Sequence, residues 1–223
     1  MDADLEDILN RHRQTHAVVW DFDGVLSETE ALHQESYTRV LAAHGMRTEG
    51  DWYTPLIGNT AQQNWRSLIA GGLDATVDDI GRLESQREAV FQSLAASGLT
   101  LSRIGASLIP AFAQGGARQD VVSNGDLNLI RHAVQQWGVG GMVNVVSRAP
   151  GTDKLALLEE RAAPGVVTFD DTDRYVLAAA RKGAYTVGVR HRHNAHASLP
   201  ADVVLHIASA ASVAVDDAAC AYG

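Results

Sequence analysis

Near its N-terminus the chain reads Ala17-Val18-Val19-Trp20-Asp21-Phe22-Asp23-Gly24-Val25-Leu26, in which an apolar run is followed by two aspartates and a glycine. The apolar residues are typical of a buried strand, and Gly24 predicts a turn after it. Because side chains alternate along a strand, Asp21 and Asp23 leave the sheet on the same side. One carboxylate of such a pair can attack an electrophile covalently while its neighbour transfers a proton. Asp and Gly also occur in ordinary turns, so this stretch alone leaves a purely structural role open.

Five more apolar runs follow along the chain, with helical segments between them. Most are rich in valine and do not alternate, which is typical of strands covered by helices on both faces. The expected strands are residues 17–20, 120–123, 143–147, 165–169, 186–189 and 203–207. The expected helices between the later strands include residues 128–137, 154–162 and 174–182. This alternation predicts an α/β fold built on a doubly wound parallel sheet.

Residues 29–105 interrupt the alternation with helical patterns and no convincing strand. The expected helices in this region are residues 30–44, 60–69 and 76–96. We predict a catalytic core formed by residues 1–28 and 106–223, with an all-helical cap domain, residues 29–105, inserted between the first two strands. An insert at that position would overhang Asp21 and Asp23 and act as a lid that excludes water. A helical subdomain without a functional role is the alternative.

The composition limits the classes of partner. The 223 residues have a net charge of −9, which gives no reason to expect nucleic acid or an anionic membrane. A bound phosphate would therefore need local hydrogen-bond donors or a metal ion. No apolar run approaches the length of a membrane span, and residues 1–15 are unlike a signal peptide. The single cysteine, Cys220, cannot form an internal disulfide, so a reducing cytoplasm is the expected location.

Two further groups of polar residues are expected at the carboxyl ends of strands, where ligands bind in such sheets. Ser123 and Asn124 follow the second strand and suit a phosphate or a carboxylate, although a helix N-cap is the alternative. Lys154, one of only two lysines, is expected at a helix start, where a cation opposes the helix dipole. A point contact to a phosphate would explain it there, and a solvated surface lysine is the other interpretation.

An acidic cluster follows the fourth expected strand and contains Asp170, Asp171 and Asp173. Carboxylates that converge there with Asp21 would form an oxygen site suited to Mg²⁺. Crowded carboxylates repel one another, so a cation is their natural counter-ion. Asp173 could instead cap the helix that follows.

Two patterns in the sequence are not assigned a function. His191, His193 and His196 lie in a polar stretch without further ligands, and we assign no metal site to them. The glycine-rich residues 138–141 precede an expected strand, whereas a dinucleotide-binding loop follows one.

Taken together, these residues resemble the motifs of the haloacid dehalogenase superfamily, in the subgroup with a helical cap that includes beta-phosphoglucomutase and phosphoglycolate phosphatase. Residues 21–26 resemble the first motif, Ser123-Asn124 the second, Lys154 the third and Asp170-Asp171 the fourth. Their order and their placement at strand ends agree as well, and the resemblance covers nearly the whole chain. It implies a Rossmann-like core and a Mg²⁺-dependent phosphatase that acts on a small phosphorylated metabolite, such as a sugar phosphate.

The resemblance also implies a role for each residue. Asp21 would be the nucleophile that forms an aspartyl-phosphate, and Asp23 would protonate the leaving oxygen and then activate water. The phosphoryl oxygens would be held by Ser123, Asn124 and Lys154. Mg²⁺ would be bound by Asp21, the backbone carbonyl of Asp23, Asp171 and, directly or through water, Asp170. Charge neutralisation and positioning provide most of the catalysis in phosphoryl transfer.

Several features narrow the chemistry within this superfamily. Dehalogenases lack the second aspartate, so Asp23 favours a phosphatase. Residues 29–105 contain no lysine, which argues strongly against the Schiff base of phosphonoacetaldehyde hydrolases. Beta-phosphoglucomutases have an arginine shortly after the glycine that Gly58 resembles, and here Asn59-Thr60-Ala61-Gln62 follows instead. Hydrolysis is therefore favoured, and a phosphomutase or a catalytically silent metabolite-binding protein are the alternatives.

Five residues of the expected cap domain are candidates for contact with the substrate. They are His33, Asn59, Thr60, Trp65 and Arg66, and each could equally have a packing or surface role.

The fourth motif departs from the superfamily pattern at one position, because Tyr175 stands where Gly or Asp is usual. The sequence does not determine the oligomeric state.

Overall fold

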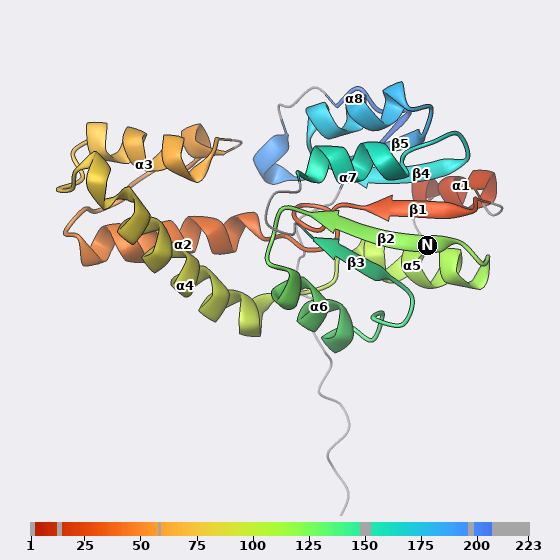
Figure 1. Cartoon of the computed structure of the whole chain (residues 1–223), viewed down its shortest axis with the longest axis horizontal. Helices are drawn as coiled ribbons and strands as arrows, with labels where there is room; N and C mark the ends of the chain where they lie inside the picture. The colour runs from red at the N-terminus through yellow and green to blue at the C-terminus, as the bar shows by residue number, and fades with distance from the viewer. Residues whose placement is uncertain (1–2, 13–14, 58, 148–152, 196–198, 207–223) are drawn as a thin grey trace, which may run out of the picture.

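The computed structural model describes residues 3–12, 15–57, 59–147, 153–195 and 199–206. Six strands form one sheet, and helices cover both of its faces (Figure 1). Within the described part of the chain, no helix combines the length and apolarity that crossing a membrane requires. Three residues named above, Cys220, His196 and Gly58, lie outside the described residues, as do residues 207–223 of the predicted core.

The sheet is parallel throughout, and its strand order is β3-β2-β1-β4-β5-β6. Its strands are β1 (Ala17–Trp20), β2 (Arg118–Ser123), β3 (Asn144–Ser147), β4 (Val166–Asp170), β5 (Tyr185–Arg190) and β6 (Val203–His206). Strands β2 and β3 lie on one side of β1, and the later strands β4, β5 and β6 lie on its other side. Ligands bind where a doubly wound sheet reverses in this way, and here that point lies between β1 and β4. The predicted doubly wound sheet is therefore confirmed.

Helices cover the two faces of the sheet because the residues of β1 alternate between two apolar cores. Val18 and Trp20 face one core, and Ala17 and Val19 face the other. The first core packs under α1 (Ala3–His12), α5 (Arg103–Gln114) and α6 (Leu127–Gln136). The second core packs under α7 (Lys154–Arg161) and α8 (Asp173–Arg181). Helices α1 and α5 were not expected from the sequence, because their amphipathic patterns lie outside the strand–helix alternation.

The predicted helical insert lies beyond the carboxyl ends of the strands, to the left in Figure 1. It consists of α2 (Glu30–Ala43), η1 (Thr54–Leu56), α3 (Ala61–Ala70), η2 (Val77–Asp79) and α4 (Ile80–Gly98). The insert has an apolar core of its own, in which Trp65 and Leu83 are fully buried beside Tyr37. Trp65 Nε1 also donates to Glu84 Oε2 at 2.7 Å. Trp65 therefore has a packing role, not the substrate contact for which it was a candidate.

The two connections between insert and core lie side by side. Ser102 N donates to Leu26 O at 2.8 Å, and Ser102 caps the N-terminus of α5. Ile104 already belongs to the core cluster under the sheet. We therefore propose that the insert ends at residue 102, slightly earlier than the boundary at residue 105 expected from the sequence.

Candidate functional site

Two buried carboxylates and a buried ammonium meet at the reversal point of the sheet. Asp21 directly follows β1, and Asp170 is the last residue of β4, the neighbouring strand. Lys154, the first residue of α7, places its Nζ 2.7 Å from Asp21 Oδ2 and 2.8 Å from Asp170 Oδ2. The predicted convergence of these three residues is therefore present in the structure.

Lys154 remains protonated in this setting. Burial alone would lower the pKa of its ammonium, but Asp170 and Asp21 raise that pKa above its ordinary value. A buried ammonium between two carboxylates acts as a fixed point charge. It is placed to attract phosphoryl oxygens beside Asp21.

Three carboxylates form a cluster that fits a divalent cation. Asp21, Asp170 and Asp171 each offer one oxygen, and these oxygens lie within 4.8 Å of one another. Burial raises the pKa of Asp21; Lys154 opposes this rise, and the neighbouring carboxylates add to it. The single positive charge of Lys154 therefore does not neutralise the three carboxylates. Oxygen-only ligands of this kind suit a hard cation such as Mg²⁺, which agrees with the expected ligand set.

Asp23 is held by hydroxyl groups from two distant parts of the chain. Thr29 Oγ1 donates to Asp23 Oδ1 at 2.8 Å, and Ser123 Oγ donates to Asp23 Oδ2 at 3.1 Å. The side chain is half-buried and borders the same cavity as Asp21. Two hydrogen bonds orient the carboxylate while leaving it accessible, as a proton-transfer group requires.

Gly24 is required where it stands for two reasons. Its φ of 73° lies in the left-handed region, which side chains other than glycine rarely adopt. A Cβ at this position would also overlap the carboxylate of Asp171 and crowd the imidazole of His191. The turn after Asp23 can therefore approach the acidic cluster only with glycine at this position.

Tyr175 joins two of the predicted phosphate-binding residues. Asn124 Nδ2 donates to the Tyr175 hydroxyl at 3.1 Å, and Lys154 Nζ lies 4.0 Å from the ring centroid. Arg174 donates to the same hydroxyl, with its guanidinium 4.4 Å from the ring. The unusual residue of the fourth motif is therefore a support for Lys154 and Asn124. The sequence signalled this position only as a departure from the superfamily pattern.

His191, to which the sequence assigned no function, lies beside the acidic cluster. Its Nδ1 accepts from His193 N at 3.2 Å, which leaves the ring proton on Nε2. Nε2 therefore donates to Asp171 Oδ2 at 2.9 Å, and Thr172 Oγ1 donates to Asp171 Oδ1 at 3.0 Å. His191 orients a carboxylate of the cluster, a role that neighbours of metal ligands commonly have. Only the fold brings the end of β5 to this position, so the polar stretch in the sequence gave no such signal.

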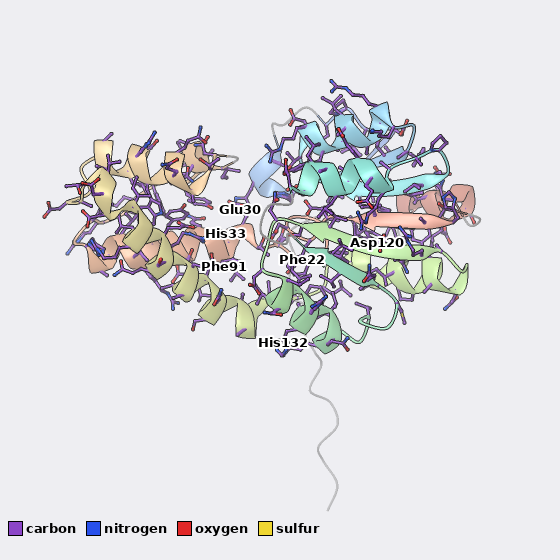
Figure 2. All side chains as sticks on the ribbon, in the orientation of Figure 1. Phe22, Glu30, His33, Phe91, Asp120 and His132 are labelled. Carbon is purple, nitrogen blue, oxygen red and sulfur yellow. The ribbon has the colours of Figure 1, made fainter. Side chains whose placement is uncertain are left out.

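A cavity of about 660 Å³ opens from these residues toward the insert. Of the predicted insert residues, His33 and Asn59 border it, whereas Thr60 and Arg66 border neither this cavity nor the one described below. Thr60 instead caps α3, accepting from Gln63 N. Figure 2 shows His33 and Glu30 on the side of the insert that faces the core.

Comparison with known proteins gives similarity in sequence and, separately, in fold. No family model matches the chain. The validoxylamine A 7'-phosphate phosphatase of Streptomyces hygroscopicus subsp. limoneus is 23% identical over 199 residues, which cover 84% of this chain and 91% of the relative.

Solved structures superpose on most of the chain. CbbY from Rhodobacter sphaeroides, solved in complex with phosphate, gives a TM-score of 0.66 at 22% identity and covers 86% of this chain and 93% of its own. A haloacid dehalogenase-like hydrolase from Streptococcus pneumoniae gives a TM-score of 0.67 at 11% identity, with the same two coverages of 86% and 93%.

The fold is the one that these solved structures share with the chain. The sheet and its helical insert superpose on those of a haloacid dehalogenase-like hydrolase and of CbbY. The residues that resemble the four motifs of the haloacid dehalogenase superfamily lie at the carboxyl ends of the strands or at the helix start beside them. The predicted α/β fold with a helical insert is therefore confirmed.

Proposed function

We propose that the protein is a Mg²⁺-dependent phosphatase that hydrolyses a small phosphate monoester through an aspartyl-phosphate. The observation that supports this most directly is the position of Lys154 Nζ, 2.7 Å from Asp21 Oδ2. An ammonium fixed beside a carboxylate can hold a phosphoryl group against that carboxylate. Asp23 lies two residues further along the chain, where it can supply and accept the proton.

The reaction has two steps in which the atoms balance. An Asp21 carboxylate oxygen attacks phosphorus, the bond to the ester oxygen breaks, and Asp23 gives that oxygen its proton. A water molecule then attacks the phosphorus of the aspartyl-phosphate while Asp23 takes its proton. Phosphate leaves, and the Asp21 carboxylate is restored.

Positioning the phosphoryl group falls to residues from three elements. Asn124, directly after β2, and Lys154, at the start of α7, would hold it, and Tyr175 supports both. A contact from Ser123 stays a prediction, because its buried hydroxyl borders neither cavity and donates to Asp23. Asp21, Asp170 and Asp171, with the Asp23 carbonyl, would hold Mg²⁺, which when bound neutralises charge on the phosphoryl oxygens. The helical insert would exclude bulk water while Asp21 attacks phosphorus.

The relatives support a phosphorylated metabolite as substrate. One is a phosphatase of validoxylamine A 7'-phosphate, and CbbY has been solved as a variant with xylulose-1,5-bisphosphate. A phosphomutase would need a cation in the insert to hold a second phosphate. Arg66 borders neither cavity, and Arg87 is bound by Glu84 and Glu88, so hydrolysis is favoured. The expected cytoplasmic location stays a prediction.

The test is phosphate release from a panel of sugar phosphates and other metabolite phosphates, with Mg²⁺ or with EDTA. Wild type is compared with Asp21→Asn and Asp23→Asn, and Asp78→Asn, an exposed residue of the insert, is the matched control. We expect release that requires Mg²⁺ and both site aspartates, and a control that behaves as wild type. A folded protein that releases no phosphate from any ester would refute the proposal. Isomerised sugar phosphate would instead identify a mutase.

A further inference from the structure

A second cavity lies at the junction of the insert and the core. Its volume is about 450 Å³, within the range of roughly 300–1,000 Å³ usual for small-molecule sites. Phe91 of α4 and Leu129 of α6 both border it, and these two helices contact each other. Figure 2 shows Phe22, His33 and Phe91 close to this junction.

Asp23 connects this second cavity with the first. Asp23, His33 and Asn124 border both cavities, whereas Asp21 borders only the first. In the proposed reaction the ester oxygen lies beside Asp23, which protonates it. The second cavity therefore lies on the leaving-group side of the reaction, away from the nucleophile.

The walls of the second cavity combine a stacked pair of aromatic rings, His33 and Phe91, with a fixed donor. Phe91 is among its lining residues, and the His33 ring stacks on Phe91 with 4.1 Å between centroids and 5° between planes. Arg87 Nη1 lies 3.3 Å from His33 Nδ1, and a guanidinium can only donate. The ring proton is therefore on Nε2, which can donate to a hydroxyl group. Aromatic faces suit the apolar face of a ring-shaped ligand.

The charge of the second cavity disfavours an additional anion. Among its described lining residues Arg87 is the only Lys or Arg, and it already donates to Glu84 at 2.8 Å and to Glu88 at 2.7 Å. Glu88 borders the cavity too, as do Asp23 and Asp126. A phosphate or carboxylate placed there would meet these carboxylates without a cation left to pair it, which costs affinity.

We propose, on the basis of the proposed phosphatase activity, that the second cavity binds the leaving group and selects a hydroxyl-bearing ring without a second anionic group. The substrate is then the monophosphate of an uncharged or cationic ring polyol. Bisphosphates and phosphorylated acids are excluded by the carboxylates of the cavity.

Binding can be measured without turnover in Asp21→Asn, by titration calorimetry with Mg²⁺ present. The probes are glucosamine 6-phosphate, glucose 6-phosphate and glucose 1,6-bisphosphate, which share a pyranose ring and a 6-phosphate and differ in the charge of the remainder. We expect glucose 1,6-bisphosphate to bind at least about tenfold more weakly than glucose 6-phosphate, and glucosamine 6-phosphate to bind most tightly. Equal or tighter binding of glucose 1,6-bisphosphate would overturn the proposal.

Substitutions added to Asp21→Asn test whether the second cavity causes this binding preference. Leu129→Trp fills the cavity, and we expect it to weaken glucose 6-phosphate at least about fivefold while inorganic phosphate binds as before. The control is Leu177→Trp, an exposed position on α8 that borders neither cavity. Asp126→Asn keeps the cap on α6, because Asn caps as well as Asp, and should reduce the discrimination against glucose 1,6-bisphosphate. Unchanged binding in both Leu129→Trp and Asp126→Asn would also overturn the proposal.

Failure of this proposal is distinguishable from failure of the proposed function. If wild type releases no phosphate but the binding preferences hold, the second cavity is a ligand site and only the phosphatase activity is refuted. If wild type hydrolyses the esters but prefers anionic leaving groups, the activity stands and the assignment of the second cavity is refuted.

Discussion

At the scale of single residues, Tyr175 shows how one side chain can support two phosphate-binding groups. Its ring lies against Lys154 and its hydroxyl accepts from Asn124. A cation is attracted to the face of an aromatic ring, more strongly where the pair is removed from water. Lys154 and Tyr175 are both buried, so this contact helps to fix the ammonium that faces Asp21.

Tyr175→Phe removes the hydroxyl and keeps the ring, so it tests the two parts of the side chain separately. The ring remains beside Lys154, but Asn124 loses its hydrogen bond, which is worth about 1 kcal/mol. We expect the inhibition constant of inorganic phosphate to rise about fivefold, and Tyr175→Leu, which removes the ring too, to raise it further. Steady-state inhibition assays measure this, with Tyr185→Phe at the start of β5 as the control. An inhibition constant unchanged in Tyr175→Phe would show that the hydroxyl does not position Asn124.

A second prediction concerns His191, which donates to Asp171. His191→Ala removes that donor, and we expect the dissociation constant for Mn²⁺, a spectroscopic substitute for Mg²⁺, to rise about tenfold or more. His191→Gln keeps an amide donor and should recover part of the affinity. Electron paramagnetic resonance measures free Mn²⁺ independently of activity. Wild-type affinity in His191→Ala would mean that His191 does not orient the carboxylate.

At the scale of elements, α3 of the insert depends on its N-terminal cap. Thr60 accepts from Gln63 N, and the Gln63 side chain accepts from Thr60 N at 2.8 Å, so the two residues form a capping box. The helix carries Trp65, the largest side chain of the insert core. Loss of the cap should therefore weaken the insert without altering the cavity walls.

Thr60→Ala is expected to lower the free energy of unfolding by about 1 kcal/mol, and Thr60→Ser to lower it less. Urea unfolding measures this, and kcat/KM on the best ester is followed in parallel. Because Thr60 borders neither cavity, we expect kcat/KM to stay at the wild-type value. A raised KM with unchanged stability would instead support the substrate contact expected from the sequence.

At the scale of the whole molecule, the buried acidic cluster links stability to pH. Burial raises the pKa of Asp170 from 3.8 to about 6, and Lys154 and Asp171 act on it in opposite directions. Between these two values the folded protein binds more protons than the unfolded chain. The cluster therefore stabilises the metal-free fold at low pH, and this contribution is lost as the pH rises through about 6.

In EDTA, we expect the contribution of Asp170 to the free energy of unfolding to fall by on the order of 1 to 3 kcal/mol between pH 4 and pH 7. Asp170→Asn removes the titrating group, so its stability should depend less on pH over this interval. Urea unfolding at several pH values compares the two proteins. Parallel pH profiles would show that Asp170 has an ordinary pKa in the folded state.

Much of the fold could be predicted because its signals are local. Each strand is a short apolar run, and each polar group of the site follows a strand or begins a helix, so Asp21, Ser123, Lys154 and Asp170 could be placed at one edge of the sheet in advance. The boundary of the insert and helix α5 were harder to predict, because the pattern of residues 103–114 does not show whether that helix packs on the sheet or on the insert.

The sequence by itself determined the doubly wound sheet, the helical insert and the strand-end motifs, since alternation and spacing along the chain specify them. Only the tertiary structure decided which side chains support these motifs. Tyr175 beneath Lys154, His191 against Asp171 and Arg87 between two glutamates are contacts between residues whose types alone are ambiguous. Their roles depend on distances and burial that arise when separate segments pack together, and no local pattern records those.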